Sequence, residues 1–156
     1  MGRTEMTTRL EALEDWASGL LAQLEPAARN KLARRIGQTL RRSQQQRIVA
    51  QRNPDGSRYA PRKQHNLLGK QGRVKRKLRM FRKLRTARFL KIQGDGNAIN
   101  LGFTGRIARI ARVHQFGLKE RDGHMSHEVK YKERQVLGFT EHDLDLIRDQ
   151  LLTHIN

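Results

Sequence analysis

Apolar residues recur every three or four positions through the first part of the chain, a spacing that places them on one face of a helix. The first series is Leu10, Leu13, Trp16, Ala17, Leu20, Leu21 and Leu24. Pro26 ends this helix, of about six turns, and suits the first turn of a second helix. The second series is Ala28, Leu32, Ile36 and Leu40, and it fades toward Ile48 and Val49. The pattern predicts a helical hairpin over residues 1–51, with a long second arm.

A turn signal follows the hairpin. Its residues are Asn53, Pro54, Asp55 and Gly56. Pro54 has a fixed φ, Asp55 can bond its own backbone, and Gly56 accepts a positive φ. Residues 57–72 are irregular and basic. A third amphipathic stretch, basic on its other faces, runs through Val74, Leu78, Phe81 and Leu84. Residues 52–86 are therefore predicted to form a basic loop and helix.

Alternating apolar positions then indicate strands. Residues 87–93 and 98–103 flank Gly94, Asp95, Gly96 and Asn97, which predicts two strands joined by a tight hairpin. Ile107, Ile110, Ala111 and His114 fit a short helix, and Gly117 is suited to cap its C-terminus.

The last part of the chain is predicted to be an exposed loop over 118–127, a strand over 128–136 and a closing helix. Thr140, with Asp143 three residues later, forms a variant of the capping box. Leu144, Ile147, Leu151 and Ile155 give the apolar face of that helix. The chain is thus expected to be one α+β domain over 1–156, with an N-terminal helical hairpin, a small antiparallel sheet and a C-terminal helix; residues 87–156 supply the sheet and closing helix.

The charge is concentrated in the middle of the chain. Its 156 residues carry a formal net charge of +18, and residues 41–91 contain 18 Lys and Arg but only one acid, Asp55. So dense a block repels itself unless a polyanion or an acidic protein surface supplies counter-charge. A binding partner is therefore expected.

Several classes of chemistry are not supported by the composition. There are no cysteines, which excludes disulfides, thiolate metal sites and thiol catalysis. The N-terminal residues have no apolar region of the signal-peptide kind, and no apolar run is long enough to span a membrane. We expect a non-secreted protein of a cytoplasm-like compartment with no membrane partner.

Candidate catalytic and cofactor sites have simpler structural explanations. His124 and His127 are spaced to share a metal, but nothing completes a site of three or four ligands, so two exposed loop histidines are favoured. His114 lies beside Val113 and Phe116, which favours a structural, hydrogen-bonded histidine over a catalytic one. The acids needed for a nuclease are missing from the basic block, and no phosphate-loop motif is present. We expect no enzyme activity, cofactor or metal.

The basic block has two chemically sound partners. Lys and Arg side chains that neutralise phosphates bind nucleic acid without sequence preference, and an acidic protein surface fits the charge equally well. Stacking of aromatic side chains on single-stranded bases is less persuasive, because the basic block has only three aromatic residues, Tyr59, Phe81 and Phe89. The candidate interface residues are Arg73, Lys75, Arg76, Lys77, Arg79, Arg82, Lys83, Arg85 and Arg88.

Three short motifs, in this order, resemble the phage virion morphogenesis family, which includes tail completion proteins of P2-like phages and related Mu-like proteins. The first is Asn53-Pro54-Asp55-Gly56-Ser57 with Pro61 and with Tyr59, where the family often has Trp. The second is Ala111-Arg112-Val113-His114-Gln115-Phe116-Gly117. The third is Arg134-Gln135-Val136-Leu137-Gly138-Phe139-Thr140. The resemblance spans nearly the whole chain, although the stretch from Arg73 to Lys91 is more basic than is usual for the family.

The resemblance implies a non-enzymatic virion protein, assembled in the bacterial host cytoplasm, that completes the tail at the head-proximal end of its tube and permits joining to the head. Such neck components are typically rings, often hexamers. The implied partners are further copies of the chain, the tail tube or its terminator, and neck or connector proteins. The basic block would then dock on acidic neighbours or line a channel for DNA. The main alternative is a small basic nucleic-acid-binding protein, and an enzyme is a distant third.

Overall fold

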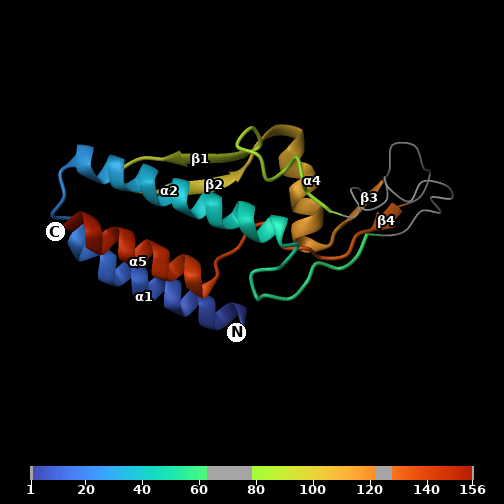
Figure 1. Ribbon diagram of the computed structural model, residues 1–156, viewed down its shortest axis with the longest axis horizontal. Coiled ribbons are helices and arrows are strands. Elements are labelled where there is room, and N and C mark those ends of the chain that lie inside the picture. The colour runs from blue at the N-terminus through green and yellow to red at the C-terminus, as the bar shows by residue number, and fades with distance from the viewer. Residues whose placement is uncertain (1, 63–78, 122–127, 156) are drawn as a thin grey trace. The chain divides into compact units, whose positions relative to one another are not determined.

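The structure is a computed structural model that describes residues 2–62, 79–121 and 128–155. Its helices in these ranges are α1 (Arg3–Leu21), α2 (Pro26–Val49), α4 (Gly105–Phe116) and α5 (Glu141–Ile155). Its strands are β1 (Leu90–Gly94), β2 (Ile99–Phe103), β3 (Lys119–Arg121) and β4 (Glu128–Lys130) (Figure 1). The fold is α+β, as expected. These strands form two separate two-stranded sheets, β1–β2 and β3–β4.

The chain divides into two compact units. The first contains Met1–Ser43, Lys91–Gly102 and Phe139–Asn156, and the second contains Gln44–Leu90 and Phe103–Gly138. Each unit therefore draws on segments that are far apart in the sequence.

The core of the first unit combines the helices that apolar spacing predicts. Its buried residues are Ala17, Leu32, Ile36, Leu40 and Leu151. Helix α1 packs along α5, and the two run in the same direction (Figure 1). Helix α1 ends earlier than expected, at Leu21, but Leu24 still packs against this core from the connecting turn.

The predicted β-hairpin packs on α2 in this unit. A Cβ on Gly37 would lie 2.6 Å from a methyl carbon of Ile92, so only glycine lets the sheet approach so closely. The carboxylate of Asp95 accepts bonds from the backbone N–H groups of Asn97 and Ala98, at 2.7 and 3.1 Å. These bonds lower the Asp95 pKa and make the Gly94–Asn97 segment a hairpin turn.

Helix α5 begins with the expected reciprocal cap. The Thr140 N–H donates to Asp143 Oδ2 at 2.9 Å, and the Asp143 N–H donates to Thr140 Oγ1 at 3.1 Å. The Ser43 hydroxyl donates to the other oxygen of Asp143, which is fully buried. The cap thereby also attaches α5 to α2 within the first unit.

The second unit has its own core. Ile48, Ala111 and Val136 are buried there, with Phe81, Phe103 and Leu137 packed against them. Helix α4 ends as predicted, because Gly117 adopts the left-handed conformation (φ 60°, ψ 45°) that caps a helix C-terminus.

Two predicted segments of this unit differ from the structure. Residues 119–121, expected in a loop, form β3 and pair with β4 in the register Glu120 to Val129. The strand expected over 128–136 ends at Lys130. The rest of that segment is committed to other partners, since the backbone N–H groups of Tyr131 and Arg134 donate to the Leu118 and His114 carbonyls.

The basic helix expected through Leu84 is not observed in its described part. Residues 82–89 form turns, and Phe81 has a φ of 65°, whereas an α-helix needs about −63°. Leu84 is nonetheless buried, as its apolar spacing indicated. Val74 and Leu78 lie outside the described residues.

Candidate functional site

The first and third sequence motifs meet in the second unit. The Asn53 side-chain oxygen accepts a bond from the Gln135 N–H at 2.9 Å, and the Tyr59 hydroxyl donates to the Gln135 carbonyl at 3.0 Å. Both polar backbone groups of Gln135 are therefore satisfied by side chains of the turn segment. Burial raises the Tyr59 pKa and keeps its phenol protonated as the donor.

The Pro54-Asp55-Gly56 segment is the turn that its residues predict. Asp55 accepts bonds from the backbone N–H and the hydroxyl of Ser57 at 2.8 and 2.5 Å, which lower its pKa. Gly56 supplies a φ of 87°. Asp55 thus has a local structural task.

The second motif is hydrogen-bonded to the third. The side-chain amide of Gln115 donates to the Leu137 carbonyl at 2.8 Å and accepts from the Leu137 N–H at 3.0 Å. Next to it, Gly138 lies against the turn, since a Cβ there would be 2.4 Å from Pro54 Cγ. All three motifs therefore converge on one interlocked region.

His114 lies at the centre of a row of rings. Its imidazole contacts Phe81 and Tyr131 edge to face, at centroid distances of 4.9 and 5.1 Å, and Phe81 contacts Tyr59 in the same way. Burial lowers the His114 pKa, and the nearby positive charge of Arg134 lowers it further. A neutral, packed imidazole fits the structural role expected for this histidine.

Arg134 is a residue of the third motif whose burial the sequence did not predict. Its guanidinium donates to the Ala60 carbonyl at 2.7 Å and to the Pro61 carbonyl at 2.9 Å, and it is only 5% exposed. Desolvation lowers its pKa. Its position between glutamate and glutamine in a polar stretch gave no sign that it would be buried. Phe116, by contrast, is a motif residue that is exposed.

Five predicted interface residues lie in the described segment 79–89, hereafter the basic segment: Arg79, Arg82, Lys83, Arg85 and Arg88. The guanidinium of Arg88 lies over the Phe89 ring, 5.4 Å from its centroid. The other four, Arg73, Lys75, Arg76 and Lys77, lie outside the described residues.

The basic segment is anchored by two glutamines, Gln45 within α2 and Gln51 just after its end. The Gln51 side chain donates to the Met80 carbonyl at 3.0 Å and accepts from the Met80 N–H at 2.8 Å. The Gln45 side chain donates to the Arg85 carbonyl at 2.7 Å. Because these bonds hold backbone groups, they leave the cationic side chains available to a partner.

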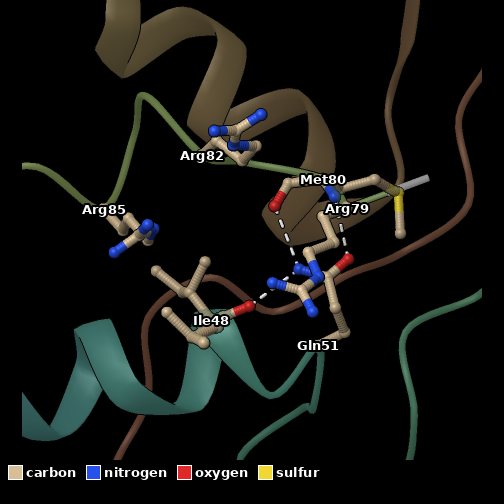
Figure 2. Close-up of a pocket in the computed structure, with 7 residues that line it drawn as sticks. Ile48, Gln51, Arg79, Met80, Arg82 and Arg85 are labelled. Carbon is tan, nitrogen blue, oxygen red and sulfur yellow. Dashed lines mark hydrogen bonds between the residues drawn. The ribbon is translucent and has the colours of Figure 1, made fainter. Parts of the chain in front are cut away.

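This anchoring creates an open pocket of about 390 Å³, hereafter the basic pocket (Figure 2). It is lined by Ile48, Val49, Gln51, Arg79, Met80, Arg82 and Arg85. Sequence reasoning identified the arginines but not the apolar lining from the end of α2. Only the folded chain brings the two together.

Two observations concern other kinds of site. Among the described residues, no three His, Asp or Glu side chains gather as a metal site would require. No described helix has the length and apolarity needed to cross a membrane. His124 and His127 lie outside the described residues.

The sequence profile of the phage virion morphogenesis family matches residues 8–156. The chain belongs to this family. The matched range covers all three motifs, the whole second unit and all of the first unit after residue 7.

One relative is the tail completion protein S of Escherichia phage P2. It is 43% identical over 143 residues, which cover 91% of this chain and 94% of the phage P2 protein. The similarity is therefore close to full length for both proteins. No solved structure matches the chain.

In this family member the net charge is confined to one unit. The segments of the second unit contain 23 Lys and Arg and 5 Asp and Glu, whereas the segments of the first contain 10 of each kind. Of the 18 Lys and Arg in residues 41–91, all but Arg41, Arg42 and Lys91 belong to the unit that holds the basic pocket.

Proposed function

We propose that this chain is a structural tail completion protein that caps the head-proximal end of a phage tail tube and enables joining to the head. The observation that carries the proposal is the 43% identity to tail completion protein S of Escherichia phage P2 over nearly the full length of both chains.

The contacts of the motif residues support a structural, non-enzymatic role. Tyr59, Gln115 and Arg134 direct their polar atoms at backbone groups of other segments. The imidazole of His114 is packed between aromatic rings. The polar side chains of these motif residues are thus occupied in joining chain segments.

In this proposal the protein is a virion component that acts as a ring, with sixfold symmetry to match the tube. A ring needs two different surfaces on each subunit, so that one fits the other on the next copy. The basic segment is one such surface, because its backbone is anchored while its side chains of Arg79, Arg82 and Lys83 are exposed.

Complementation tests this function. A phage that lacks the gene for this chain should produce filled heads and unjoined tails, visible by electron microscopy, and supplying the wild-type chain should restore infectious particles. Joined, infectious particles in the absence of the chain would refute the proposal. Gold-labelled protein should mark the head-proximal end of isolated tails.

A second variant tests the role of the basic segment. Replacing Arg79, Arg82 and Lys83 with Gln should preserve the fold, because these side chains are exposed, yet block head joining. The matched control replaces exposed Arg106, Arg109 and Arg112 of α4 with Gln. Equal particle yields from the two variants would remove the basic segment from the mechanism.

The charge of the second unit favours one other candidate, a small basic nucleic-acid-binding protein. Binding through phosphates would weaken steeply as salt is raised, without sequence preference. Tight binding of duplex DNA at physiological salt, with no affinity for tail tubes or neck proteins, would favour this candidate over tail completion.

A further inference from the structure

The two helices that form one side of the first unit carry an excess of acids. Helices α1 and α5 expose seven carboxylates and three arginines: Glu5, Glu11, Glu14, Asp15, Glu141, Asp145 and Asp149 against Arg3, Arg9 and Arg148. This surface is opposite in sign to the second unit. Each copy of the chain therefore carries two regions whose charges are complementary.

Exposed apolar side chains lie on the same helices. Trp16 is 43% exposed on α1, and Leu152 is 45% exposed on α5. An ion pair between Arg9 and Glu141 marks one side of the α1–α5 pair. Trp16 follows Arg9 by two helical turns, and Leu152 follows Glu141 by three, so both lie on that side.

We call this side the acidic face and define it by Glu5, Trp16, Glu141, Asp145, Asp149 and Leu152. Its four acids outnumber the two arginines beside them: Arg9 pairs with Glu141, and Arg148 lies 3.3 Å from Asp145 and 3.8 Å from Asp149. Exposed pairs of this kind contribute little to stability. Their carboxylates can therefore exchange partners at low cost.

The basic pocket has the matching chemistry. Guanidinium groups of Arg79, Arg82 and Arg85 surround it, while its lining includes Ile48 and Val49, and Val49 is 46% exposed. Gln51, which lines the pocket, and Phe81, which lies between the lining residues Met80 and Arg82 in the sequence, have positive φ values of 56° and 65° without being glycine. Such strain is concentrated at functional sites.

We propose that the acidic face of one copy docks on the basic pocket of a second copy, with Trp16 inserted among the arginines. This inference rests on the ring of the proposed function and assigns the two surfaces that would close it. Guanidinium groups attract the face of an indole ring, and apolar side chains around it exclude water. Trp and Arg are also the residues that contribute most to binding energy at protein interfaces. DNA phosphates would use the arginines but not Val49 or Ile48.

Trp16 reports this contact directly, because it is the only tryptophan of the chain. Raising the protein concentration at low salt should shift its fluorescence to the blue and protect it from a soluble quencher, in step with the mass measured by sedimentation. High salt should reverse both changes, since it screens the charges. Association that leaves Trp16 open to the quencher would overturn the proposal, as would a wild-type chain that stays monomeric throughout.

Charge reversal identifies the surfaces. Asp145→Lys with Asp149→Lys on the acidic face, or Arg79→Glu with Arg82→Glu in the pocket, should each weaken association by about tenfold or more. Mixing the two variants should restore it, because each then offers the surface that the other lacks. Combining all four changes in one chain should restore self-association as well.

Controls place the same charge changes elsewhere. Glu11→Lys with Glu14→Lys lies on α1 away from Trp16, and Arg106→Glu with Arg112→Glu lies on exposed α4. Both should associate like the wild type. If the controls weaken association equally, or the mixed variants fail to associate, the assigned surfaces are wrong.

The two proposals fail in different ways. If the wild-type chain complements a phage lacking its gene, but the Asp145→Lys/Asp149→Lys and Arg79→Glu/Arg82→Glu variants each associate like the wild type, tail completion stands and the docking surfaces do not. If the variants behave as expected in sedimentation but the wild-type chain does not complement, the contact stands and tail completion does not. Loss of DNA binding without loss of self-association would identify the pocket as a phosphate site instead.

Discussion

The side-chain amide of Gln115 bonds both polar backbone groups of Leu137, at 2.8 and 3.0 Å. One glutamine at the end of α4 thus satisfies both backbone hydrogen-bonding groups of Leu137, as a neighbouring strand would in a sheet. Because Leu137 adjoins Val136, a fully buried core residue, this pair fixes the third motif against α4.

Gln115→Ala should therefore lower the free energy of unfolding by about 1–3 kcal/mol, since it leaves a partly buried N–H and carbonyl without their partner. Gln115→Glu should also destabilise, because a carboxylate accepts from the N–H but cannot donate to the carbonyl. Urea denaturation measures both. Gln38→Ala, at an exposed position of α2, is the control and should change stability little. Equal effects at the two positions would contradict the assigned role.

The close approach of Gly138 to Pro54 gives a second prediction. A Cβ at residue 138 would meet a proline ring carbon at 2.4 Å, and the ring is held by its turn, so Gly138→Ala should cost about 1–3 kcal/mol. Shortening the partner with Pro54→Ala should recover part of that loss in the double variant.

Gly19→Ala is the matched control for this pair. A Cβ on Gly19 meets nothing within 4 Å, and the residue lies inside α1. Alanine should therefore stabilise the helix by about 0.5–1 kcal/mol. Thermal and chemical denaturation of the three variants would show opposite signs at residues 19 and 138; the same sign at both would exclude the steric explanation.

Sequence reasoning was most successful where one residue type has one physical task. Gly117 was predicted to cap α4 because a helix that ends in the left-handed conformation favours glycine, and Asp143 was predicted to cap α5 from its spacing to Thr140. Both are observed. The hairpin around Asp95 was identified for the same reason, because a short connection of turn residues permits only antiparallel strands.

It failed where a distant segment decides the local structure. Strand β3 contains only polar residues and forms because β4 pairs with it. Periodicity through Leu84 predicted a helix, but the two bonds from Gln51 to Met80 hold the preceding backbone in another path. Burial of Arg134 depends on carbonyls of residues 60 and 61, more than seventy positions away. Local patterns cannot reveal such partners.

The buried position of Leu151 leads to a test of the first core. Leu151 is 2% exposed and its neighbour Leu152 is 45% exposed, so the two differ in burial but not in chemistry or helix propensity. Leu151→Ala should cost about 2–5 kcal/mol and Leu152→Ala much less. Denaturation in high salt, which screens the proposed contact between copies, makes the comparison. Similar costs would contradict the assignment of Leu151, and not Leu152, to the core.

The surroundings of His114 predict a pH dependence of stability. Burial and Arg134 lower its pKa in the folded chain below the ordinary value of about 6.5, so the unfolded chain binds the proton more readily. The contribution of His114 to the free energy of unfolding is therefore fully present above about pH 6.5, and it is lost as the pH falls toward the lowered pKa. Urea denaturation over that range should show this loss. In the His114→Gln variant the free energy of unfolding should change less with pH over the same range.

Arg134→Met provides the mechanistic check. It keeps the volume of the side chain but removes the positive charge, so the His114 pKa should rise when followed by NMR of the imidazole. The variant should also be destabilised, because the Ala60 and Pro61 carbonyls lose their donor. Asp55 supplies an internal contrast, since its lowered pKa gives a stability loss only at pH values below about 4. An unchanged His114 pKa in the methionine variant would show that the charge of Arg134 does not contribute to lowering it.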